Sequence, residues 1–202
     1  MKPYSIPAAP VVVEQIVKRS QFICYIEHCP TKADADAFIR RISEKHPDAN
    51  HNCWACVAGN PGDPAGYGMS DDGEPRGCAG KPMFNVLHHS GIGEICAVVS
   101  RYFGGIKLGT GGMARAYSSS VQLAMDQLDT RVKINYARIA LTLPYSLLKT
   151  TEHLISEVEG TVADAEYAAD IQLIAEIPES MEELFQERIR EASQGTILYQ
   201  KD

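Results

Sequence analysis

The sequence contains no apolar run long enough to cross a membrane. Near its start Pro3, Pro7 and Pro10 interrupt every apolar stretch and Glu14 follows them, so no signal peptide is predicted. The six cysteines lack dense, regular spacing, which indicates reduced thiols and not a disulfide framework. These absences argue against secretion and membrane insertion, and we expect a cytoplasmic protein with no membrane partner.

Motifs for several common chemistries are also missing. The sequence has a single CxxC pair, Cys53 and Cys56, and on a strand these side chains point to opposite faces, so we expect no metal site. Gly104 and Gly109 have the spacing of a P-loop, but Thr110 stands where the motif requires lysine. No Ser/His/Asp string or dinucleotide fingerprint is present. We therefore expect no cofactor and lean against an enzyme.

Charge is unevenly divided within the total of −7. Residues 1 to 135 carry 14 Lys and Arg against 13 Asp and Glu, a balance of +1, whereas residues 136 to 202 carry 5 against 13, a balance of −8. Between residues 76 and 115 only Glu94 opposes five basic residues, which are Arg76, Lys81, Arg101, Lys107 and Arg115. A polyanion would be attracted to this stretch and repelled by the C-terminal part.

The C-terminal part, residues 134 to 202, predicts the order βαββαβ, a ferredoxin-like unit. Strands are expected at residues 134–143, 161–167, 170–177 and 196–200. The first helix has Thr151 at position i, followed on the same face by Leu154, Ile155 and Val158 at i+3, i+4 and i+7, and it ends at Gly160. Ser180 and Glu183 have the spacing of a capping box that opens the second helix.

Residues 1 to 133 predict a separate α+β domain. Strands are expected at residues 11–18, 21–27, 51–58 and 95–103, the last being central. A capping box of Thr31 and Asp34 opens one helix, residues 82–90 form a short one, and a long amphipathic helix begins near Gly112.

The segment from Arg101 to Gly112 predicts an anion site, because a strand feeding a glycine loop and a helix N-terminus presents unpaired N–H groups to a ligand. Its glycines allow positive φ and close approach of a ligand. The alternative is a tight strand-to-helix connection in which the glycines serve packing. The candidate phosphate- or nucleic-acid-binding residues are Arg101, Tyr102, Gly104, Gly105, Lys107, Gly109, Gly111, Gly112, Arg115 and Lys81.

A second segment places three carboxylates within four residues. Such a cluster could hold Mg²⁺ or act in acid–base catalysis, yet Asp-Gly and a following proline are strong turn formers. We favour a structural turn that shapes the edge of a binding groove, with Arg101 or Lys81 pairing one carboxylate. The turn comprises Ser70, Asp71, Asp72, Gly73, Glu74 and Pro75.

These two glycine-containing segments resemble the IMPACT/YigZ family of small cytoplasmic proteins. The resemblance extends in order through Ile6-Pro7-Ala8, His51-x-Cys53 and Ala116-Tyr117, and it indicates the short bacterial form. It implies an N-terminal domain similar to domain IV of elongation factor G and a C-terminal domain similar to its domain V. Three positions depart from the family pattern: Asn50, Cys78 and Ser100 stand where Arg, Thr and Val are usual.

Three classes of function remain open. The resemblance and the basic stretch favour a translation-associated protein that binds RNA or the ribosome through its N-terminal domain. The first alternative is a protein-interaction regulator of a translational stress response, with the acidic C-terminal domain as its surface. The second is an enzyme acting on a phosphorylated small molecule.

Overall fold

The chain folds into two compact α+β units, as predicted. The computed structural model describes residues 3–201 and separates Tyr4–Lys133 from Ile134–Asp202. Each unit has its own buried core.

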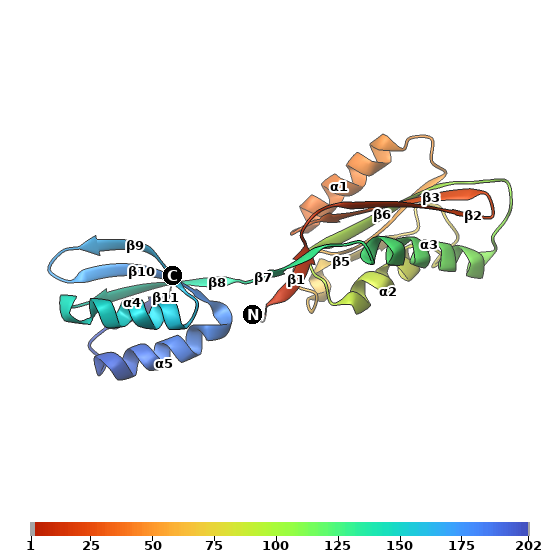
Figure 1. The fold of residues 1–202 in the computed structure, drawn as a ribbon. Helices are drawn as coiled ribbons and strands as arrows, with labels where there is room; N and C mark the ends of the chain where they lie inside the picture. The colour runs from red at the N-terminus through yellow and green to blue at the C-terminus, as the bar shows by residue number, and fades with distance from the viewer. Residues whose placement is uncertain (1–2, 202) are drawn as a thin grey trace. The chain divides into compact units, whose positions relative to one another are not determined.

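The first unit is built on a five-stranded antiparallel sheet in the order β2-β3-β6-β4-β5 (Figure 1). Helix α1 covers one face of this sheet, and α2 and α3 cover the other. The strands are β2 (Val11–Val17), β3 (Ser20–His28), β4 (His51–Val57), β5 (Tyr67–Ser70) and β6 (Ile95–Tyr102), and the helices are α1 (Lys32–Lys45), α2 (Gly80–Ser90) and α3 (Thr110–Met125).

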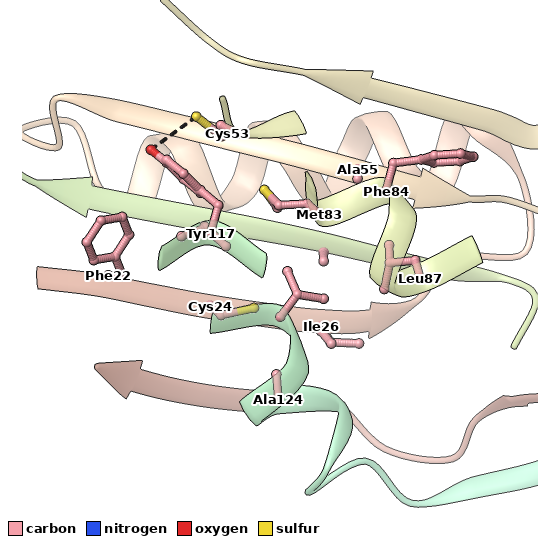
Figure 2. Close-up of a cluster of buried hydrophobic side chains, with 14 of the residues drawn as sticks. Phe22, Cys24, Ile26, Cys53, Ala55, Met83, Phe84, Leu87, Tyr117 and Ala124 are labelled. Carbon is pink, nitrogen blue, oxygen red and sulfur yellow. Dashed lines mark hydrogen bonds between the residues drawn. The ribbon is translucent and has the colours of Figure 1, made fainter. Parts of the chain in front are cut away.

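Strand β6 lies at the centre of the sheet and explains why its sequence is almost continuously apolar. Its first seven residues are all buried, because helices cover both faces. Ile95, Ala97 and Val99 join the core under α2 and α3, while Cys96 and Val98 join the core under α1. Figure 2 shows the first of these cores.

The capping box of Thr31 and Asp34 is present at the start of α1, as predicted. The predicted capping box at Ser180 is wrong. A 3-10 turn, Glu179–Met181, takes its place, and α5 begins only at Glu182 without a side-chain cap.

The second unit has the predicted βαββαβ order, and its sheet has the order β11-β8-β10-β9. Helices α4 and α5 cover one face only (Figure 1), so β8 alternates between buried and more exposed residues where β6 does not. The elements are β8 (Tyr136–Leu143), α4 (Leu148–Glu157), β9 (Thr161–Tyr167), β10 (Ile171–Pro178), α5 (Glu182–Ser193) and β11 (Leu198–Lys201).

A short antiparallel ribbon was not predicted from the sequence. Strands β1 (Tyr4–Pro7) and β7 (Thr130–Lys133) pair residues from the two ends of the first unit. Each strand has only four residues, so its apolar pattern is too short to be recognised.

The side chain of Glu94 ties this ribbon to the rest of the unit. The carboxylate is 2 % exposed and accepts hydrogen bonds from Tyr4 Oη at 2.9 Å and from Lys133 Nζ, while His28 Nε2 lies 2.6 Å from its second oxygen. Desolvation acts to raise the pKa of Glu94, but the hydrogen bonds from Lys133, His28 and Tyr4 outweigh it and hold the pKa below its ordinary value. The ionised carboxylate therefore stabilises the folded unit.

We predict that Glu94→Gln lowers the free energy of unfolding near neutral pH by about 1.5 to 3 kcal/mol, the range for hydrogen bonds to a charged group. Because the folded pKa is depressed, this contribution is complete above the unfolded value of 4.5 and is lost as the pH falls through the folded value. Denaturant unfolding of both proteins at about pH 7 and about pH 3.5 checks this. A stability difference that does not shrink in acid would contradict the prediction.

Candidate functional site

The glycine loop between β6 and α3 is tethered at its start by packing. A Cβ on Gly104 would lie 2.0 Å from the carbonyl carbon of Arg19, so only glycine fits there. Ser20 Oγ accepts a hydrogen bond from the Gly104 N–H at 3.2 Å, and Asn50 Oδ1 accepts one from the Phe103 N–H at 2.7 Å. Gly104 therefore allows the loop to pack closely against the backbone of Arg19.

Positive φ is confined to two other glycines of the loop. Gly105 has φ +83° and Gly109 has φ +74°, and a Cβ at either would meet no atom within 4 Å. Gly111 and Gly112 lie in the first turn of α3 and do not have positive φ. A need for positive φ therefore does not explain why glycine occupies these two positions.

Within residues 3–201 no side chain is seen to cap the N-terminus of α3. Its N-cap residue is Gly109, no side chain caps it, and its first turn contains no acidic residue. A Cβ built on Gly111 would lie 3.9 Å from Arg115 Nη1, so this guanidinium folds back over the first turn. The unpaired N–H groups and the cation together favour an anion at this point.

The N-terminus of α2 is different, because Asp71 occupies it. Asp71 Oδ1 accepts hydrogen bonds from the N–H groups of Gly80 at 2.8 Å and Ala79 at 3.0 Å, and Oδ2 accepts one from Gly77 at 2.7 Å. Desolvation acts to raise the pKa of Asp71, but these backbone hydrogen bonds outweigh it and lower the pKa. Asp71 is thus a helix cap supplied by the preceding turn.

The other two carboxylates of the turn are also held by protein donors. Asp72 Oδ2 accepts a hydrogen bond from the Asn52 N–H at 2.6 Å. Glu74 is buried, and its Oε1 lies 2.5 Å from Arg101 Nη1 and 2.8 Å from the hydroxyl of Tyr117, which donates to it. The sequence suggested either Arg101 or Lys81 as the partner of one carboxylate. In the structure Arg101 is paired with Glu74.

Arg101 is a correction to the sequence-based site. It is 6 % exposed and its charge is paired with Glu74, so it does not supply charge to a ligand on the surface. Strand periodicity places it towards α3, where its side chain packs between Glu74 and Met113. Tyr102, the next residue, points to the opposite face, where its hydroxyl lies 2.9 Å from His46 Nδ1. Both side chains are therefore engaged by partners within the protein.

Two cations that sequence reasoning missed lie beside the loop. Lys18 and Arg19 form the turn between β2 and β3, with φ of 46° and 67°. The backbone of Arg19 packs against Gly104, and Gln15 Nε2 holds β2 to α3 by donating to the Ala116 carbonyl at 2.8 Å. Two adjacent basic residues between two predicted strands could have indicated a basic turn. The sequence does not show that this turn lies beside the glycine loop, because that position depends on the fold.

A hollow of about 290 Å³ lies where these segments meet, and Lys18, Leu108, Gly112 and Arg115 are among its lining residues. Lys107 is exposed in the loop itself. We call Lys18, Arg19, Lys107, Arg115 and the first turn of α3 the basic rim. Lys81 lies on α2 instead, with its ammonium 5.4 Å from the centre of the Phe84 ring.

Cys53 and Cys56 point to opposite faces of the sheet, as the strand spacing predicted. Cys53 Sγ lies 3.3 Å from Tyr117 Oη, the contact drawn in Figure 2, and 3.0 Å from the Asp71 carbonyl. Across residues 3–201 no cluster of three or more His, Cys, Asp or Glu is arranged to hold a metal ion.

Two family models match this chain. The Impact N-terminal domain matches residues 18–125, and a domain of unknown function, DUF1949, matches residues 141–196. The chain belongs to the IMPACT family. Membership supports a regulatory, translation-related role.

Two relatives align with nearly the whole of this chain. It is 42% identical to an IMPACT family member of Haemophilus influenzae over 99% of this chain and 97% of that protein. It is 41% identical to the IMPACT family member YigZ of Escherichia coli, over 98% and 97%. A solved structure titled a crystal structure of an hypothetical protein has a TM-score of 0.70 and 41% identity, covering 98% and 97% of the two chains. No helix within residues 3–201 has the length and apolar character needed to cross a membrane.

We predict that Asp71→Ala lowers the free energy of unfolding by about 2 kcal/mol, at the upper end for loss of a helix cap, because three N–H groups lose their acceptor. Asp71→Asn should cost less, since one acceptor oxygen remains. The control is Asp36→Ala on the exposed surface of α1, for which we expect a change within about 0.5 kcal/mol. Denaturant unfolding measures all three, and equal effects of the two alanine variants would contradict the role of Asp71 as a cap.

We also predict that Mg²⁺ leaves the thermal midpoint almost unchanged, because Asp71, Asp72 and Glu74 already accept hydrogen bonds from the protein. A bound ion at a hundred times its dissociation constant would stabilise the fold by about 2.7 kcal/mol. A large shift specific to Mg²⁺ that disappears in the double variant Asp71→Asn, Asp72→Asn would instead favour a metal-dependent enzyme.

Proposed function

We propose that this protein binds structured RNA or the ribosome through phosphate contacts at the basic rim. The observation that carries the proposal is the uncapped N-terminus of α3, with Arg115 folded over it and Lys18 lining the same hollow. Backbone N–H groups and flexible cations are the groups that bind a phosphate without reading its sequence.

The two helix N-termini support the same conclusion. The N-terminus of α2 takes a carboxylate from the preceding turn, Asp71, whereas no side chain among residues 3–201 is seen to cap that of α3. An anion from another molecule would accept hydrogen bonds from the first N–H groups of α3, as Asp71 does from those of α2. The acidic C-terminal residues would repel the same polyanion and so orient it towards the first unit.

A protein partner for the C-terminal unit is the second candidate, favoured by one observation. The sheet of this unit has helices on one face only, and Leu198 on its edge strand is 68% exposed. With its balance of −8, this unit would suit a partner with a basic surface. The third class, an enzyme acting on a phosphorylated molecule, is less well supported because the three carboxylates of the 70–75 turn are held by protein donors.

We predict that Lys107→Ala and Arg115→Ala each weaken RNA binding and each lower the slope of log affinity against log salt by about one unit, as expected for loss of one phosphate contact. Ribosome co-sedimentation and gel shifts at several salt concentrations measure this. Matched controls are Lys32→Ala and Arg40→Ala, which remove the same charges from α1 on the opposite face of the sheet.

If the α1 variants weaken binding as much as the rim variants do, the effect is one of net charge and the rim is not the site. No retention of RNA or ribosomes even at low salt, or equal binding by residues 136–202 alone, would contradict the proposed function itself. Thermal midpoints of all variants separate loss of binding from loss of folding.

A further inference from the structure

A groove between α2 and α3 lies next to the basic rim and has no role in the function proposed so far. Its cavity of about 740 Å³ is within the range of small-ligand sites. Val86 and Met125 give it apolar surface, and polar side chains from both helices complete its lining.

The polar groups of this groove are suited to the edge of a nucleobase. Asn85 and Gln122 contribute amides, and Ser118 contributes a hydroxyl. His89 Nδ1 lies 2.6 Å from the backbone carbonyl oxygen of Asn85 and donates to it, which leaves Nε2 as an acceptor in the neutral ring. Gln122 Nε2 donates to Asp126 Oδ1 at 2.8 Å, which leaves the Gln122 carbonyl as an acceptor. Donors and acceptors thus occur together beside apolar surface.

Arg115 connects the groove to the rim. It lines both the cavity of about 740 Å³ and the hollow of about 290 Å³, and its guanidinium lies over the first turn of α3. An RNA strand with one phosphate at that turn would therefore run along α3, and a neighbouring nucleotide of the same strand would reach the groove, whose residues Gln122 and Met125 lie about 16 to 21 Å further along the helix. A guanidinium can also stack on an unpaired base.

We propose that the α2–α3 groove binds an unpaired nucleotide of the RNA, with the base against Val86 and Met125 and its edge hydrogen-bonded to Asn85 and Gln122. This inference rests on the proposed RNA binding and names the form of RNA that is bound. Paired bases cannot enter the groove because their faces are stacked and their Watson–Crick edges are paired in the duplex. The protein therefore selects single-stranded or looped RNA over duplex.

The test compares one labelled single-stranded RNA of mixed sequence with the same strand annealed to its complement, using fluorescence anisotropy and the intact chain. We expect the single strand to bind at least about tenfold more tightly, a difference that one bound base supplies. Asn85→Ala and Gln122→Ala should each weaken single-strand binding by roughly fivefold or more and leave duplex binding unchanged. Gln127→Ala, an exposed glutamine just beyond α3, is the control and should have no effect.

A second measurement uses a nucleoside 5′-monophosphate as the probe and follows the side-chain amide signals of Asn85 and Gln122 by NMR. Movement of these signals supports the groove as the base site. Equal affinity for duplex and single strand, or groove variants that bind the single strand like the parent, overturns this inference but leaves the phosphate rim in place. Failure to bind either form of RNA overturns the proposed function as well.

Discussion

The ion pair between Glu74 and Arg101 is the interaction on which the first unit depends. It joins the 70–75 turn to the central strand, and the Tyr117 hydroxyl adds α3 to the same carboxylate. A buried carboxylate or guanidinium without its partner costs several kcal/mol, so neither charge is tolerated alone. Phe22, packed edge-to-face on Tyr117 at 5.3 Å, continues this contact into the apolar core. Turn, strand and helix are therefore fixed relative to one another by one charged cluster.

That cluster explains how two segments that look alike in sequence come to have different roles. Glu74 anchors the 70–75 turn to β6, and Asp71 of the same turn caps α2, whereas α3 begins at Thr110 without a side-chain cap. Carboxylates in the first segment satisfy the protein's own donors, whereas the second segment leaves its donors exposed. This difference is why the second segment, and not the first, is the one proposed to recruit an anion.

Much of the fold could be predicted because its elements have strong local signals. The capping box at Thr31 and the apolar run of β6 depend on neighbouring residues and on burial, and both are confirmed. The ribbon of β1 and β7 was missed because it pairs four-residue strands from the two ends of the unit, and its tether Glu94 acquires its partners only in the folded chain. Local patterns do not carry that information.

The candidate site was less predictable, because charge in a sequence does not reveal burial. Arg101 looked like a surface cation, yet its place on β6 directs it into the unit, while Lys18 and Arg19 reach the loop only because Gly104 lets their turn approach. Asn50 is a similar case. Its side chain accepts a hydrogen bond from the Phe103 N–H and holds the start of the glycine loop, a role that its sequence position does not reveal. The cations proposed to bind a ligand are those around α3 for which no ion pair is seen within residues 3–201, and Arg115 is the member that lines both the groove and the hollow.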